Sequence, residues 1–152
     1  MISLTTIQKA AEVLRGCVIR TPLVYSPTFS HLTGAEVYLK LENLQETGSF
    51  KLRGASYKIR NLLGKIGPKG VVAASAGNHA QGVALAAKRA GLKATIVMPE
   101  SASLSKQEAT RSYGGKVVLV GQNIGECIQK AELLAEEGLS LVHPFDVPDI
   151  IA

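Results

Sequence analysis

The second half of the chain alternates short apolar runs with longer amphipathic stretches. The apolar runs after Gly70 are rich in Val, Ile and Ala, which is typical of buried strands: residues 71–75, 93–99, 116–120 and 140–144. The amphipathic stretches between them have helical spacing and end near glycine: residues 78–91, 103–114 and 123–138. This order predicts an α/β fold with a parallel β-sheet and helices on both faces.

The first half has a looser pattern. Thr5 and Gln8 form a capping-box spacing before a helix that Gly16 should end, and Ser26-Pro27 starts a short helix that Gly34 should close. Residues 36–41 alternate like a strand, and residues 64–70, GKIGPKG, are the best linker candidate.

The helix predicted over residues 49–63 has cations in its first turn, which is unusual for a helix N-terminus. Ser49 is the expected N-cap, so Lys51 and Arg53 fall in the first helical turn. The N-terminus of a helix carries partial positive charge and disfavours cations. Both this helix end and Arg53 should lower the pKa of Lys51 and favour a neutral, nucleophilic amine. A solvated surface lysine is the simpler alternative.

Composition narrows the class of protein. The chain has 152 residues, of which 46% are hydrophobic and 19% charged, as expected for a globular α/β protein. The net charge of +5 comes from scattered basic residues, and with few aromatic residues we expect no nucleic-acid partner. Two distant cysteines favour reduced thiols in a cytoplasmic protein. No segment approaches the ~20 apolar residues of a membrane span, so we expect no membrane partner.

The turn after the first strand of the second half has the composition of an anion-binding site. Ser75-Ala76-Gly77-Asn78-His79 places small residues before a helix start with free N–H groups, which suit a carboxylate or phosphate. An ordinary strand-to-helix turn explains the same residues equally well. The P-loop, GxGxxG, GxSxG and HExxH motifs are missing from the sequence, and no histidine has metal-ligand spacing, so we expect no metal.

Two motifs together are more specific than either alone. TGSFKLRGA (residues 47–55) and SAGNHAQG (residues 75–82) resemble the paired signatures of threonine and serine ammonia-lyases. These are pyridoxal-phosphate enzymes of fold type II, the tryptophan-synthase β family. Within that family the motifs are most similar to those of threonine deaminases. Shorter matches lie along most of the chain: RTPL (20–23), KLENLQ (40–45), IVMPE (96–100), ATRSYG (109–114) and HPFD (143–146).

The resemblance implies a role for each matching residue. Lys51 matches the lysine that holds pyridoxal phosphate as a Schiff base and then acts as the catalytic base. Asn78 matches the asparagine that hydrogen-bonds the pyridine ring oxygen, and Phe50 would pack near that ring, although a core phenylalanine looks identical in sequence. The substrate carboxylate would bind the loop made of Ser75, Ala76, Gly77, Asn78 and His79.

The implied reaction is elimination from threonine or serine, which gives a 2-oxo acid (2-oxobutanoate from threonine) and ammonia. The implied setting is amino-acid metabolism, including isoleucine biosynthesis. Serine racemases are similar, but they carry a serine where this chain has Ala76. Since alanine has no proton to give, the resemblance favours elimination over racemisation.

The resemblance also implies an incomplete enzyme, because family members are considerably longer. Residues 1–65, which include Lys51, would belong to a large cofactor-binding domain, and residues 66–149 would form a small three-layer αβα domain. The rest of the large domain, with its phosphate-binding glycine loop, would be absent. We expect a homo-oligomer that acts on a small amino-acid substrate. The alternative is a catalytically silent αβ module, perhaps self-associating, with at most weak anion binding.

Overall fold

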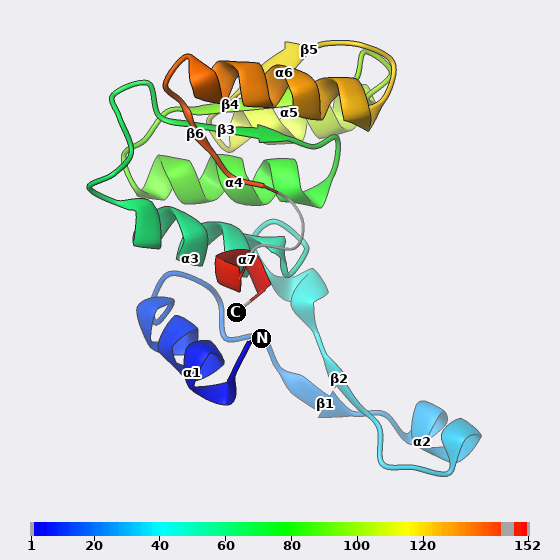
Figure 1. Ribbon diagram of the computed structural model, residues 1–152. Helices are drawn as coiled ribbons and strands as arrows, with labels where there is room; N and C mark the ends of the chain where they lie inside the picture. Colours follow the sequence, from blue (N-terminus) through cyan, green and yellow to red (C-terminus); the bar gives the residue numbers. More distant parts are fainter. Residues whose placement is uncertain (1, 144–147, 152) are drawn as a thin grey trace.

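A computed structural model describes residues 2–143 and 148–151 of the chain. Figure 1 shows the sequence of elements, with a layered body and an arm that projects from it. The helices are α1 (Leu4–Val13), α2 (Pro27–Thr33), η1 (Glu42–Leu44), α3 (Lys51–Leu62), α4 (Asn78–Arg89), α5 (Leu104–Ser112), α6 (Ile124–Glu136) and α7 (Pro148–Ile151). The strands are β1 (Leu23–Tyr25), β2 (Tyr38–Lys40), β3 (Val71–Ala74), β4 (Ala94–Met98), β5 (Gly115–Leu119) and β6 (Ser140–Leu141).

The body is built on a parallel sheet with the strand order β5-β4-β3-β6. Val71 aligns with Ala94 of β4 and with Ser140 of β6, so β3 is central, and all four of its residues are buried. Helix α6 packs on one face, while α4, with α5 beside it, packs on the other. The predicted α/β fold with helices on both faces is therefore confirmed.

Alternate residues of the strands pack into two separate hydrophobic cores, one on each face of the sheet. Ala73 and Ile96 point toward α4 and α3, whereas Val72 and Val97 pack against Cys127 of α6. This period of two is the geometry of a strand that is covered on both faces. It explains why the strand sequences are apolar throughout rather than alternating.

Helix α3 forms a further layer over α4 (Figure 1). Gly82 of α4 allows a very close approach, because a Cβ atom there would lie 3.1 Å from the carbonyl carbon and oxygen of Lys51. On the opposite side, Gly54 of α3 meets the Ile150 carbonyl of α7, and a Cβ atom there would overlap the carbonyl oxygen. Glycines on α3 and α4 thus allow α3 to pack closely between α4 and α7.

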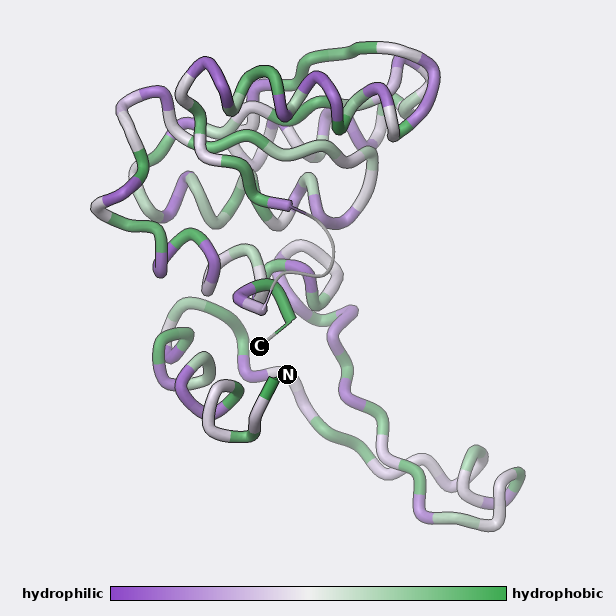
Figure 2. The backbone as a smooth tube through the Cα atoms, in the orientation of Figure 1, coloured by the Kyte–Doolittle hydropathy of each residue, from purple (hydrophilic) through white to green (hydrophobic). Residues whose placement is uncertain are grey.

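The N-terminal segment packs on α3 and then leaves the body. Ala10 and Leu14 form a small core with Tyr57 of α3. Antiparallel strands β1 and β2 then carry α2 away from the body, and every residue of both strands is exposed. Figure 2 shows hydrophobic residues along this arm as well as inside the body.

Several predicted helix boundaries are confirmed. Ser26 caps α2 with Pro27 in its first turn, and Gly34 closes it at φ 69°. The helices predicted over residues 78–91, 103–114 and 123–138 correspond to α4, α5 and α6, and the four predicted strands to β3, β4, β5 and β6.

Two predicted caps are wrong. Ser3, not Thr5, caps α1 by accepting the N–H of Thr6, and α1 ends at Val13, before Gly16. Ser49 does not cap α3, which begins at Lys51 after Phe50, without a side-chain cap in the described part of the chain. Ser49 is instead buried.

The division into residues 1–65 and 66–149 stays a prediction. Pro144, Phe145 and Asp146 of the HPFD match lie outside the described residues.

Candidate functional site

A pocket of about 430 Å³ opens at the carboxyl ends of the central strands. Ligands of parallel sheets bind at this edge, where strand ends meet helix N-termini. The pocket brings together Lys51 and the whole turn that the sequence singled out. Its lining residues are Lys51, Ala74, Ser75, Ala76, Gly77, Asn78, His79, Pro99 and Ile124.

Lys51 is half-buried at the first position of α3. Its ammonium nitrogen lies 5.2 Å from the centre of the Phe50 ring. Among the described residues it faces no carboxylate and makes no hydrogen bond. An amine beside a helix start without a compensating anion is free to react with a ligand. Phe50 itself is 59% exposed, which excludes the core-phenylalanine reading.

Arg53 does not act on Lys51 in the way its position in the helix suggested. Its Nε and Nη2 atoms donate to the Glu42 carboxylate at 2.9 and 2.7 Å, and Nη2 also donates to the Ile19 carbonyl. This pairing, above all the hydrogen bond from Arg53, lowers the pKa of Glu42. The guanidinium charge is therefore compensated within the N-terminal segment.

The turn between β3 and α4 presents donors to the pocket. The Ser75 hydroxyl accepts the N–H of Gly77 at 3.2 Å, which folds the turn on itself. Gly77 precedes α4, whose first N–H groups receive no side-chain cap from the described residues. The Asn78 side chain is exposed at the pocket wall and makes no hydrogen bond within the described chain. Free N–H groups at a helix start, beside an amide, suit an anionic ligand.

The His79 side chain points away from solvent. It is 4% exposed, and its Nε2 atom lies 3.1 Å from the carbonyl oxygen of Val142, just after β6. Since a carbonyl can only accept, Nε2 donates the proton and Nδ1 is left as a buried acceptor without a partner among the described residues. Burial lowers the pKa of His79 to about 4, and the positive charges of Lys51 and His143 act in the same direction. The side chain therefore anchors the turn, and only the backbone of His79 is left to bind a ligand.

The groups that line the pocket test whether it fits the cofactor that the resemblance implies. The buried atoms without a partner in the described chain, Thr47 Oγ1, Ser49 Oγ and His79 Nδ1, do not bear on this, because Thr47 and Ser49 do not line the pocket and the His79 side chain is tied to Val142. An uncompensated lysine, uncapped helix starts and a free amide form a donor set that suits an anionic aldehyde such as pyridoxal phosphate.

Sequence reasoning missed three lining residues, Ala74, Pro99 and Ile124. Ala74 is the last residue of β3, Pro99 directly follows β4, and Ile124 starts α6 after β5. Because parallel strands end at the same edge, this signal was available once the strand order was known.

Two classes of site are not found in the described residues. No group of three or more His, Cys, Asp or Glu side chains there could hold a metal ion. None of the described helices has the length and apolar character needed to span a bilayer.

Comparison with known proteins agrees with this geometry. Residues 14–152 match the family model described as "Pyridoxal-phosphate dependent enzyme". The catabolic L-threonine dehydratase TdcB of Staphylococcus aureus (strain N315) is 50% identical over 154 aligned residues, which cover 100% of this chain and 44% of that protein. The chain thus spans less than half the length of the curated relatives that it matches.

Solved structures give the same picture. The processed form of threonine deaminase isoform 2 from Solanum lycopersicum is 40% identical, with a TM-score of 0.86 over 99% of this chain and 43% of that one. Maize serine racemase is 36% identical, with a TM-score of 0.91 over 99% of this chain and 46% of that one. Both an elimination enzyme and a racemase therefore share this fold.

Proposed function

Because this chain belongs to the family of pyridoxal-phosphate dependent enzymes, we propose that it carries the catalytic lysine and the substrate-carboxylate loop of a threonine or serine ammonia-lyase. The observation that supports the proposal most is the convergence of Lys51 and the Ser75–His79 turn on one pocket. The relative that is 50% identical acts on L-threonine by its name, which favours threonine as substrate and 2-oxobutanoate as product.

Lys51 provides the reactive amine. As a cofactor ligand it would hold the aldehyde of pyridoxal phosphate, and once freed by the substrate its Nζ atom would accept the proton from the substrate Cα. Pyridoxal phosphate, when bound, supplies an electron sink for that carbon. The exposed Phe50 ring, next to the amine, would be covered by the cofactor or by the substrate.

The turn before α4 binds and orients the substrate. The N–H groups at the start of α4 would donate to the substrate carboxylate, and the Ser75 hydroxyl would donate to the same group while it accepts from Gly77. The Asn78 amide would donate to the ring oxygen of the cofactor without adding charge. His79 contributes through its backbone, because its side chain is tied to Val142.

Ala76 separates the proposed activity from racemisation. A racemase needs a second proton-transfer group on the opposite face of the substrate carbon, and the methyl group of Ala76, which lines the pocket, has no proton to give. Elimination requires only the base and a leaving hydroxyl. A chain that binds neither cofactor nor substrate is the remaining alternative.

Labelling of Lys51 tests the proposal. The full 152-residue chain is incubated with pyridoxal phosphate, reduced with borohydride and mapped by mass spectrometry of its peptides. We expect the pyridoxyl group on Lys51 and its loss in Lys51→Ala, whereas Lys65→Ala, which removes an exposed lysine beyond α3, keeps the label. A label spread over surface lysines would reject the assignment. Release of 2-oxobutanoate from threonine, measured on the same preparation, then tests the activity separately.

A further inference from the structure

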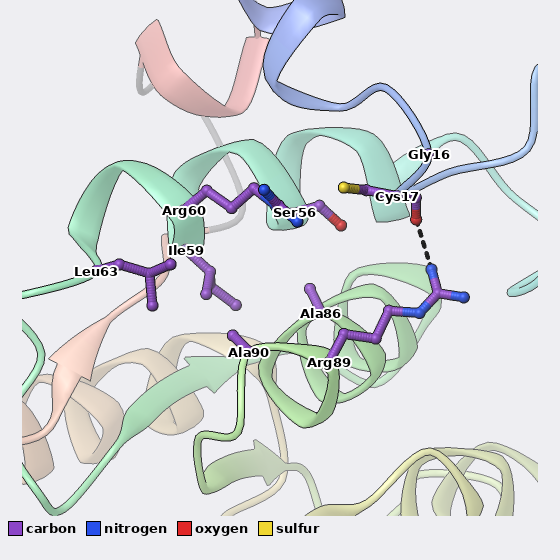
Figure 3. Close-up of a pocket in the computed structure, with 9 residues that line it drawn as sticks. All are labelled: Gly16, Cys17, Ser56, Ile59, Arg60, Leu63, Ala86, Arg89 and Ala90. Atoms are coloured by element: carbon purple, nitrogen blue, oxygen red, sulfur yellow. Dashed lines mark hydrogen bonds between the residues drawn. The ribbon is translucent and has the colours of Figure 1, made fainter.

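A second pocket lies between α3 and α4, away from the candidate active site. Figure 3 shows its residues, which come from α3 and α4, from the residue that directly follows each of them, and from the loop after α1. Its volume is about 510 Å³, within the ordinary range for small-molecule sites. It shares no lining residue with the pocket that contains Lys51.

Two arginines supply the charge of this pocket. Arg60 is exposed on α3 and has no hydrogen bond or ion pair within the described residues. Arg89 of α4 donates from Nη1 to the Cys17 carbonyl at 2.6 Å and from Nη2 to the Glu46 carboxylate. A guanidinium has five N–H donors, so Arg89 keeps three for a ligand. Since Glu46 compensates Arg89, the pocket has a net charge of about +1.

The other groups in the pocket are a hydroxyl and an apolar wall. Ser56 is 6% exposed, yet its hydroxyl has no partner in the described chain and lines the pocket. Gly16, Cys17 and the side chains of Ile59, Leu63, Ala86 and Ala90 complete the lining beside it. The Ser56 hydroxyl is not one of the buried unsatisfied atoms named above, so it is accessible to a ligand in the pocket, to which it can donate a hydrogen bond.

We propose that this pocket binds a small aliphatic monocarboxylate. The carboxylate would accept hydrogen bonds from Arg60, Arg89 and the Ser56 hydroxyl, and its alkyl part would lie on Ile59 and Ala86. A net charge of about +1 favours a monoanion over a phosphate dianion. An amino acid fits less well, because no acidic side chain lines the pocket to receive its ammonium group.

Ligand choice makes the proposal testable without any enzymatic activity. Butanoate is titrated into the ¹⁵N-labelled full chain, and amide shifts are followed by NMR. Butanoate should move the amides of residues around the pocket, with tighter binding than acetate, which lacks the apolar part. Butylammonium, 2-aminobutanoate and inorganic phosphate should bind at least about tenfold more weakly. Equal binding of butylammonium, or no saturable shift with butanoate, would overturn the proposal.

Substitutions in the pocket test which side chains bind the carboxylate. Arg60→Gln should weaken butanoate binding about tenfold or more and Arg60→Lys less, because a charge-assisted hydrogen bond is lost in the first and partly kept in the second. Ser56→Ala should weaken binding by a smaller factor. Lys65→Gln removes the same charge just beyond α3 but outside the pocket, and should leave affinity unchanged. If Lys65→Gln and Arg60→Gln weaken binding equally, the attraction is nonspecific and the site is rejected. Arg60 is exposed, so its variants should keep the wild-type circular dichroism spectrum.

Discussion

The burial of His79 should make the protein lose stability in mild acid. In the folded protein the pKa of His79 is lowered to about 4 from an ordinary value of 6.5, mainly because the imidazole is buried. The unfolded chain therefore binds a proton at a higher pH than the folded chain does. The His79 contribution to the free energy of unfolding is constant above about pH 6.5, falls as the pH decreases toward 4, and levels off below that.

The size of this loss follows from the two pKa values. The gap spans about 2.5 pH units at about 1.4 kcal/mol each, which gives a limiting loss of about 3 kcal/mol. At pH 5, where the unfolded histidine is almost fully charged and the folded one still neutral, the loss is about 2 kcal/mol. This pH also lies above the ordinary pKa of the Glu42 carboxyl group, 4.5, so protonation of that group contributes little to the loss of stability there.

Urea unfolding at pH 7 and pH 5 measures the effect in the wild type and in His79→Gln. The glutamine amide can still donate to the Val142 carbonyl but does not titrate, so the variant should lose about 2 kcal/mol less between the two pH values. The comparison uses the change with pH, so a constant cost of the substitution does not affect it. His31→Gln, at an exposed histidine of α2, serves as the control. The reasoning is refuted if wild type and His79→Gln show the same change with pH, or if His31→Gln reduces it as much.

Three further substitutions test contacts near the site by the same denaturation assay. Gly82→Val should cost about 1–3 kcal/mol more than Gly82→Ala, because the added methyl groups meet the backbone of Lys51; equal stabilities would show that the two helices can separate freely. Gln45→Leu should cost about 1–3 kcal/mol, since Gln45 hydrogen-bonds both the N–H and the carbonyl of Ile19 at 2.9 and 3.0 Å, and an unchanged midpoint would exclude that role. Glu42→Gln should cost about 1–2 kcal/mol at low salt, with the difference shrinking as salt is added if the ion pair is responsible.

Much of the fold could be predicted because local signals agreed with the tertiary structure. The runs around Val71 and Ile96 are apolar throughout, as strands covered on both faces require, and Pro27 and Gly34 bound α2 where their backbone preferences place them. The meeting of Lys51 with the Ser75–His79 turn was implied by the family resemblance alone, because α3 follows β2, which is not a strand of the parallel sheet.

The failures concern side chains whose partners are distant in sequence. Ser49 is a good N-cap by type, but it is buried and unpartnered, and α3 begins two residues later. Arg53 looked like a neighbour that would repel the charge of Lys51, yet it pairs with Glu42, eleven residues away. The inward orientation of His79 depends on Val142, which follows the neighbouring strand β6, 63 residues further along the chain. Local propensity contains no information about such pairs.

Strand β5 forms an outer edge of the parallel sheet, with β4 as its one neighbour in the described chain. An outer strand offers unpaired backbone groups to which a strand of another molecule can add, and such addition leads to aggregation. Lys116 lies exposed in this strand, and a second molecule would have to bring its own backbone against that charge. Removal of this charge in Lys116→Val should therefore lower the solubility of concentrated samples.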